Sequence, residues 1–226
     1  MCFSATANFA GSAVLGTIGA VTLTEVKHRR ELLFASLPLL FATHQFIEGF
    51  VWLGLDGKLP STVTYHAGEA YVVFAQGLLP LLMPLGVMLM EPTEAARRRM
   101  LPFVFLGVAL SLYMLWGLAV FPLQVYALDN SVVYKNQATN RTSLAVLYVI
   151  ATCGSLFFSK IRGLILFGAA NLGILLVVMA VKRYAFTSLW CAYAAVASII
   201  IWVYFRNNRH ARASFYSRLL ETSAFG

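Results

Sequence analysis

The amino-acid sequence predicts an all-α fold: a polytopic integral membrane bundle of seven transmembrane helices, forming a single domain over residues 1–226. Composition is the first observation: 60% of the residues are hydrophobic, 12% are charged and the mean hydropathy is +0.76, which lies outside the range of soluble domains. The second is that apolar stretches long enough to span a bilayer follow one another with little interruption. The third is an uneven distribution of basic residues among the connecting loops.

Seven apolar stretches can be delimited in the sequence, and each approaches the ~20 residues that a spanning helix requires. They cover approximately residues 3–24, 31–55, 62–90, 100–126, 142–159, 161–182 and 185–205. Almost no sequence is left for a soluble domain. The first stretch begins at the initiator methionine, has no basic segment and lacks a convincing cleavage site, so we expect a retained helix and not a signal peptide.

The basic residues predict the orientation of this bundle. With the N-terminus outside, twelve of them fall in inner loops or the C-terminal tail and five fall outside. Cytoplasmic loops carry an excess of lysine and arginine, so we expect an outside N-terminus and a cytoplasmic C-terminus in a multi-pass protein of the cell membrane, such as a bacterial inner membrane. The inner set is Lys27, Arg29, Arg30, Arg97, Arg98, Arg99, Lys160, Arg162, Arg206, Arg209, Arg212 and Arg218, and the outer set is Lys58, Lys135, Arg141, Lys182 and Arg183.

The net charge of +8 is explained by this topology and by contact with the lipid bilayer, which is the expected partner. Nucleic acid is not an expected partner, because the basic residues are spread over separate loops and do not form one stripe.

The first stretch carries small residues at every fourth position, namely Ser4, Asn8, Ser12 and Gly16. Such a face lets a neighbouring helix approach closely, so we expect packing to be its main role and a ligand contact of Asn8 to be the alternative.

The second and third stretches hold the ionisable residues. His44, Glu48 and Trp52 are spaced i, i+4 and i+8, and therefore share one helical stripe. His66 and Glu69 share a stripe of the third stretch, where Pro80 and Pro84 break or kink the helix and leave carbonyl groups for neighbouring helices to satisfy. The short turn at 56–60 makes the two helices antiparallel neighbours. The Glu48 and Glu69 carboxylates then lie at about the same depth, about 10 Å below the outer ends of their helices.

The remaining stretches carry fewer polar residues. Tyr148, Thr152 and Ser155 share a face of the fifth stretch, but serine and threonine in membranes often bond only to their own helix. The segment 127–141 is the one sizeable outer loop and a candidate lid.

Two carboxylates and two imidazoles at membrane depth indicate function, because such groups are costly in lipid and usually face the bundle interior. Glu48, Glu69, His44 and His66 supply ligand types that suit a divalent metal, and zinc, manganese and iron are not distinguished. His and Glu at i, i+3 or i, i+4 spacing are the pattern of metal sites in helical bundles. We therefore expect an outward-facing cation site on these four residues.

Two other interpretations of the same residues stay open. Two carboxylates at one depth in a low dielectric do not both ionise cheaply, so the pair is also a credible proton acceptor of a proton-coupled or small-solute transporter. Alternatively, each acid is hydrogen-bonded within the bundle, and the protein is a structural subunit of a homo-oligomer or of a larger membrane complex.

If the protein is an enzyme, we expect the bound metal to take part in catalysis. A metal-bound water would attack an amphiphile from the outer leaflet, with Glu48 or Glu69 as the base. Trp52, Trp190 and Tyr193 would form the pocket walls. Cys2 would add a ligand from outside, and Cys191 also falls near the outer face, whereas Cys153 is expected to be an inert, buried residue.

The opening Met1-Cys2-Phe3-Ser4-Ala5-Thr6-Ala7-Asn8-Phe9 resembles that of an uncharacterised family of bacterial membrane proteins that begin MCFSATASF. Asn8 stands where that family has serine. The resemblance implies a shared bundle with its N-terminus outside, and no particular reaction. It also implies that a family pattern in the outer half includes Cys2, Gln45, Glu48, Trp52 and Cys191. The matching segments are Leu37-Pro38-Leu39-Leu40-Phe41-Ala42, His44-Gln45, Glu48-Gly49, Trp52 and Trp190-Cys191.

Overall fold

Helices account for most of the chain, which the computed structural model describes over residues 4–128, 131–181 and 186–207, with side chains left undescribed at 177–195. Two of the helical elements, η2 and η3, are π-helical, and η1 is a 3₁₀ turn. In chain order the elements are α1 Ala5–Thr24, η1 Arg29–Glu31, α2 Leu32–Ala35, α3 Leu37–Leu55, α4 Ser61–Val72, η2 Val73–Leu78, α5 Leu79–Met90, α6 Glu94–Val120, β1 Gln124–Leu128, β2 Ser131–Lys135, α7 Thr142–Val149, η3 Ile150–Gly154, α8 Ser155–Phe157, α9 Arg162–Val181 and α10 Phe186–Asn207.

In the described ranges these elements group into seven apolar helical segments, as the hydropathy pattern predicts. Four are long and apolar enough to cross a membrane: Ala5–Thr24, Arg29–Leu55, Ser61–Met90 and Glu94–Val120. Three shorter apolar helices are described over Thr142–Phe157, Arg162–Leu176 and Val196–Asn207. The chain therefore has the helical, apolar make-up of a membrane protein.

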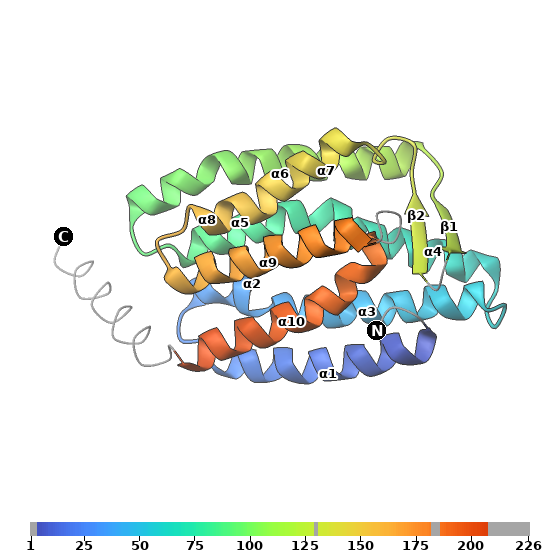
Figure 1. The fold of residues 1–226 in the computed structure, drawn as a ribbon, viewed down its shortest axis with the longest axis horizontal. Helices are drawn as coiled ribbons and strands as arrows, with labels where there is room; N and C mark the ends of the chain where they lie inside the picture. Colours follow the sequence, from blue (N-terminus) through green and yellow to red (C-terminus); the bar gives the residue numbers. More distant parts are fainter. Residues whose placement is uncertain (1–3, 129–130, 182–185, 208–226) are drawn as a thin grey trace.

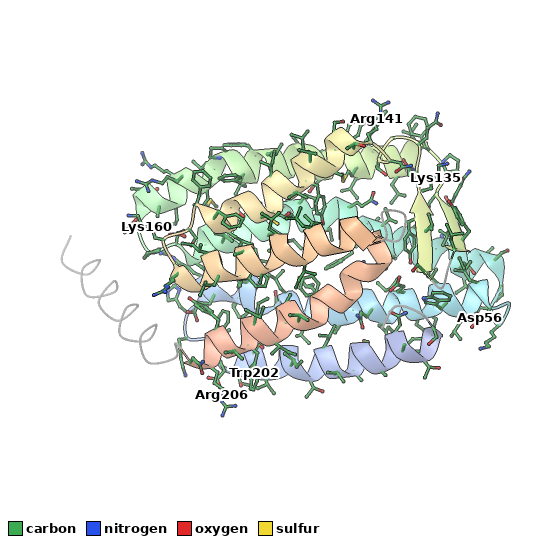
Figure 2. All side chains as sticks on the ribbon, viewed as in Figure 1. Asp56, Lys135, Arg141, Lys160, Trp202 and Arg206 are labelled. Carbon is green, nitrogen blue, oxygen red and sulfur yellow. The ribbon has the colours of Figure 1, made fainter. Side chains whose placement is uncertain are left out.

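The helices lie side by side along one long axis, and the β1–β2 hairpin lies at one end (Figure 1). We call this the hairpin end, and Asp56, Lys135 and Arg141 lie there (Figure 2). We call the opposite end, where Lys160 and Arg206 lie, the basic end.

The hairpin corrects two expectations, a fourth helix that reaches residue 126 and a loop over 127–141. Helix α6 ends at Val120, and β1 and β2 pair antiparallel with Val125 opposite Tyr134. Pro122 explains the early end, since proline has no N–H to donate and disfavours helical geometry at the residue before it. The segment that follows is rich in valine and tyrosine, residue types that favour strands.

Close packing of α1 on α3 confirms the role predicted for the small residues of the first stretch. Ser12 Oγ donates a hydrogen bond to the Ala42 carbonyl oxygen at 2.8 Å. A Cβ atom on Gly19 would lie 2.7 Å from the Leu39 nitrogen, too close for any larger residue. Glycine at this position is thus what allows the two backbones to approach.

Two apolar clusters divide the interior along the helix axis. On α3, Phe41 and Ala42 belong to a large cluster that extends toward the basic end, while Val51 and Trp52 belong to a second cluster at the hairpin end. The polar residues of α3 fall between these clusters, and the candidate site is built around them.

Candidate functional site

Three buried polar residues follow one another within a little more than one turn of α3. Gln45 and Glu48 are 0% exposed and His44 is 3% exposed. They are buried because α3 is packed by α1 on one side and by α4 and α10 on others. A fully buried carboxylate is costly unless it is hydrogen-bonded, paired or protonated. Glu31 and Glu91 are equally buried, but they lie at helix ends and accept hydrogen bonds from backbone N–H groups, whereas Glu48 lies within α3.

Asn8 of α1 lies at the same level. It is 0% exposed and one turn beyond Ser12 toward the hairpin end. Because Ser12 is bonded to Ala42, a rise of ~1.5 Å per residue places Asn8 between Gln45 and Glu48 in depth. The Asn8 Nδ2 atom donates to the Ser4 carbonyl, whereas Oδ1 has no partner among the described residues.

His44 is fixed by contacts with α4. Its Nε2 atom donates to the Tyr71 carbonyl oxygen at 3.2 Å, since a carbonyl can only accept, and its ring stacks on the Tyr71 ring with centroids 3.8 Å apart. Tyr134 of β2 also stacks on Tyr71, at 4.4 Å. Two rings do not fit on one face at these distances, so the stack runs from His44 through Tyr71 to the hairpin.

His66 and Glu69 lie elsewhere. Their side chains are 74% and 30% exposed and pair with each other, His66 Nδ1 to Glu69 Oε2 at 3.0 Å. Glu69 is two residues before Tyr71, a rotation of about 200° around a helix, so it is turned away from the side of α4 that packs on His44. The match in depth with Glu48 does not bring the two carboxylates to the same face.

The four-residue metal set expected from the sequence is therefore not assembled. Within residues 4–128, 131–176 and 196–207, no group of three or more His, Cys, Asp or Glu side chains is placed to hold a metal ion. Any further ligand from Cys2 or from Cys191 would lie outside the described side chains.

Of the residues predicted to form the pocket walls, Trp52 has a described side chain. Trp52 is 6% exposed, and its indole Nε1 has no partner among the described residues. The backbone of Trp190, Cys191 and Tyr193 belongs to α10, which contacts α1, α3 and β2, but their side chains lie outside the described residues, as does Cys2. Cys153 is free and buried on η3, as expected.

The sequence did not predict the contact between Tyr148 and the π-helical segment η2. In η2 the Leu79 N–H bonds to Phe74 O, five residues back, and the next bond in this series would run from residue 80 to Ala75 O. Residue 80 is proline, which has no N–H, and the Tyr148 hydroxyl donates to Ala75 O instead, at 2.8 Å. The prediction that Pro80 leaves carbonyl groups for neighbours is thereby confirmed, although Tyr148 was not identified as the donor.

We expect Tyr148→Phe to lower the free energy of unfolding by about 1 kcal/mol, because Ala75 O would lose its donor in an apolar interior. In a Pro80→Ala background the cost should shrink, since residue 80 then supplies an N–H. Chemical unfolding in detergent of the two single variants and the double variant measures this coupling. Tyr113→Phe is the control, because the Tyr113 hydroxyl reaches Ala138 O only at 3.4 Å. Equal losses with and without Pro80 would contradict the assignment.

The arrangement as a whole is an enclosed polar site. It combines one carboxylate with amide and imidazole groups and the indole N–H of Trp52, and it lies between two apolar clusters. Carboxylate and amide oxygens in such surroundings attract a cationic group, because the low dielectric strengthens each electrostatic contact.

Comparisons with known proteins give a family and no activity. No curated protein and no solved structure matches the chain. A family model described as "Family of unknown function (DUF6629)" matches residues 1–215. This match spans nearly all of the 226 residues, so the chain belongs to the DUF6629 family.

Proposed function

We propose that the chain is a seven-span protein of the cell membrane, with its N-terminus outside, its C-terminus in the cytoplasm, and the bacterial inner membrane as the expected setting. The seven apolar segments support the number of spans. The arginine and lysine residues of the basic end, among them Lys160 and Arg206, support a cytoplasmic position for that end. The hairpin end and the Glu48 site then lie on the outer side.

A reporter fused to the C-terminus tests this orientation. We expect a fluorescent reporter that matures in the cytoplasm to be active there, and an alkaline phosphatase fusion at the same position to be inactive. The opposite pair of results would reverse the topology and place the Glu48 site on the cytoplasmic side.

The function we propose is binding of a cation at the buried site around Glu48. The observation that carries it is that Asn8, Gln45 and Glu48 are completely buried at one level of two packed helices. Acids at membrane depth usually serve an ion, a proton or a substrate. The unpartnered Asn8 Oδ1 adds a neutral acceptor next to the carboxylate level.

A protonated amine fits these groups better than a metal ion. An ammonium group donates to several oxygens at once, and the Glu48 carboxylate and the Asn8 and Gln45 amides provide them. The Trp52 ring offers a cation–π surface in the same region. A metal ion would require a further ligand such as Cys2 or Cys191. The same requirement applies to a metal-dependent enzyme in which Glu48 is the general base.

The apolar packing favours access from the hairpin end. The large cluster that includes Phe34, Met83 and Phe205 fills the interior between the site and the basic end. Transport through the bundle is the second candidate. The buried side-chain oxygens of Gln76 and Asn171, which have no hydrogen-bond partner within the described part of the chain, favour it, since they extend the polar groups deeper among the helices.

Melting of the detergent-purified protein in the presence of probe cations tests the binding proposal. We expect a saturable rise in melting temperature with one class of cation, an alkylammonium salt being the first probe and zinc and manganese salts the second. Glu94→Gln is the matched control, because Glu94 is an exposed acid of the basic end and its loss should leave the shift unchanged. No saturable shift with either class, or loss of the shift in Glu94→Gln, would contradict the proposal.

A further inference from the structure

At the basic end, α6 packs against η3 and against Phe158, the residue that follows α8, through an aromatic seam. The Phe103 and Phe158 rings lie 5.3 Å apart, and a Cβ atom on Gly154 would lie 2.6 Å from Phe103 Cε1. Glycine at 154 therefore lets the Phe103 ring rest on the η3 backbone. We call this contact the Phe103–Phe158 seam.

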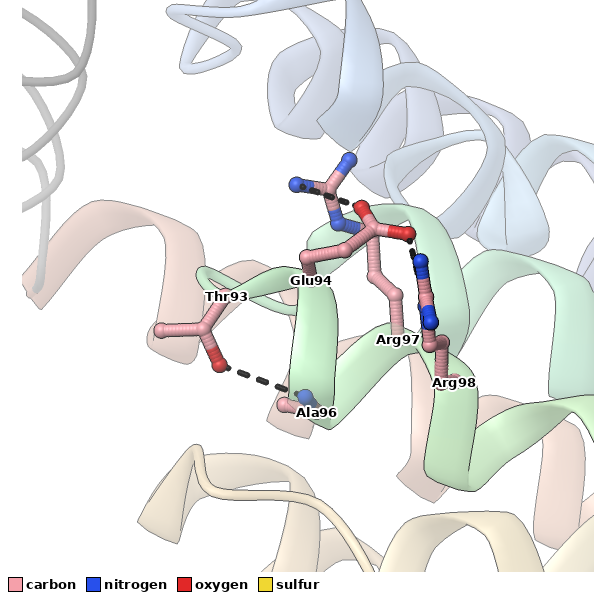
Figure 3. A network of polar contacts seen from close by, with 5 residues as sticks. All are labelled: Thr93, Glu94, Ala96, Arg97 and Arg98. Atoms are coloured by element: carbon pink, nitrogen blue, oxygen red, sulfur yellow. Dashed lines mark hydrogen bonds and ion pairs between the residues drawn. The ribbon is translucent and has the colours of Figure 1, made fainter. Parts of the chain in front are cut away.

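Two exposed cations flank the seam on the side of the basic end. Arg99 is one turn before Phe103 on α6, and Lys160 follows Phe158 by two residues. Neither side chain has an ion-pair partner among the described residues. By contrast, Glu94 pairs with both Arg97 and Arg98 at 3.6 and 3.4 Å, next to the Thr93 hydroxyl that caps α6 (Figure 3).

The backbone that carries Lys160 is held in place. Glu91, at the end of α5, is 1% exposed and accepts hydrogen bonds from the Ser159 hydroxyl and from the Lys160 N–H. The Ile161 N–H donates to Ser159 Oγ at 3.0 Å. These bonds use the Glu91 carboxylate below the surface and fix the position from which the Lys160 side chain extends.

Exposed apolar residues border the seam. Phe158 is 61% exposed and Phe157 is 40% exposed. On α6, Leu101 and Phe105 are also exposed, but each is two residues from Phe103, a rotation of about 200°, so they face away from the seam. The surface at the seam thus changes, within about one helical turn, from two cations with no ion-pair partner in the described ranges to apolar aromatic rings.

We propose that an anionic phospholipid binds at this seam, with its headgroup phosphate on Arg99 and Lys160 and its acyl chains along Phe103 and Phe158. Charge complementarity favours this occupant, since two cations with no acidic partner among the described side chains lie beside apolar rings, and α6, which carries Arg99, is long enough to cross a membrane. A single molecule that is anionic at one end and apolar over the rest matches both parts. The site is separate from the Glu48 site and does not depend on cation binding there.

Native mass spectrometry of the full-length protein released from lipid nanodiscs tests the site. The probe is phosphatidylglycerol, mixed into phosphatidylcholine, and the variants are Arg99→Gln, Lys160→Gln and their combination. We expect apparent affinity for phosphatidylglycerol to fall about fivefold for each removed cation, which is the contribution of one basic residue beside an anionic membrane. Both residues concerned are exposed, so melting in pure phosphatidylcholine should be unchanged.

Arg98→Gln is the matched control, because it removes the same charge from the same turn but from a side chain that pairs with Glu94. Affinity retained by Arg98→Gln and lost by the other variants supports the proposal. It is overturned if the double variant binds phosphatidylglycerol like the wild type, or if Arg98→Gln weakens binding equally, which indicates only general attraction to the membrane. Binding of soluble glycerol phosphate with the same affinity as phosphatidylglycerol would also overturn it, since the site would then bind free phosphate.

Discussion

Gly107→Leu should prevent the bundle from packing and should lower the free energy of unfolding by about 3 kcal/mol or more. A Cβ atom at this position would overlap the Pro80 carbonyl oxygen and would lie 3.1 Å from Leu81 Cα. Both are backbone atoms that no rotamer change can move. The expected result is little folded protein after extraction, with a lowered unfolding midpoint for the fraction that remains.

Gly173→Leu is the matched control for this prediction. Gly173 is also a helical glycine, on α9, and a Cβ atom there meets no atom of the described residues within 4 Å. Its replacement should change the free energy of unfolding by no more than about 0.5 kcal/mol. Similar unfolding midpoints for the two variants would contradict the close approach of α6 to α5.

Glu48→Gln should fold like the wild type and should weaken binding of the stabilising cation at least thirtyfold. The amide keeps the shape of the side chain but loses its charge, and removing one member of a buried charged pair costs roughly 2–5 kcal/mol of binding free energy. The measurement is the concentration dependence of the cation-induced melting shift, compared with that of the wild type.

Glu48→Leu separates a binding role from a structural one. If the acid serves only as a hydrogen-bonded member of the interior, glutamine substitutes almost silently and leucine is the damaging change, because buried partners stay unsatisfied. Our account expects the glutamine variant already to lose binding while its melting temperature without ligand stays close to the wild type. Wild-type binding by Glu48→Gln would favour the structural alternative.

Hydropathy was sufficient to predict most of the helices, because a long apolar stretch in lipid must satisfy its backbone hydrogen bonds internally. The helices of the described ranges follow the predicted stretches, and the stripe of small residues on α1 meets α3 as expected. The hairpin was missed because the hydropathy of valine and tyrosine at 123–126 continued that of the helix before it. Pro122 was the local signal that the helix had ended.

The candidate site was predictable only in part, for a geometric reason. His44 and Glu48 share a stripe of α3, and both are buried as their spacing suggested. The sequence spacing of Glu69 predicts its depth along the helix but not which side of α4 faces α3. Tyr71 decides that side, because its ring stacks on His44. An unremarkable tyrosine in an apolar stretch gives no sequence signal of such a contact.

Infrared difference spectroscopy of the carboxylate bands tests the central claim most directly, because it observes the charged group itself. Adding the stabilising cation to the wild-type protein should perturb a carboxylate stretching band, and the same addition to Glu48→Gln should leave no such band in the difference spectrum. The Glu94→Gln protein should respond like the wild type. An identical cation-induced carboxylate signal in Glu48→Gln would show that the cation binds elsewhere and would contradict our account of the Glu48 site.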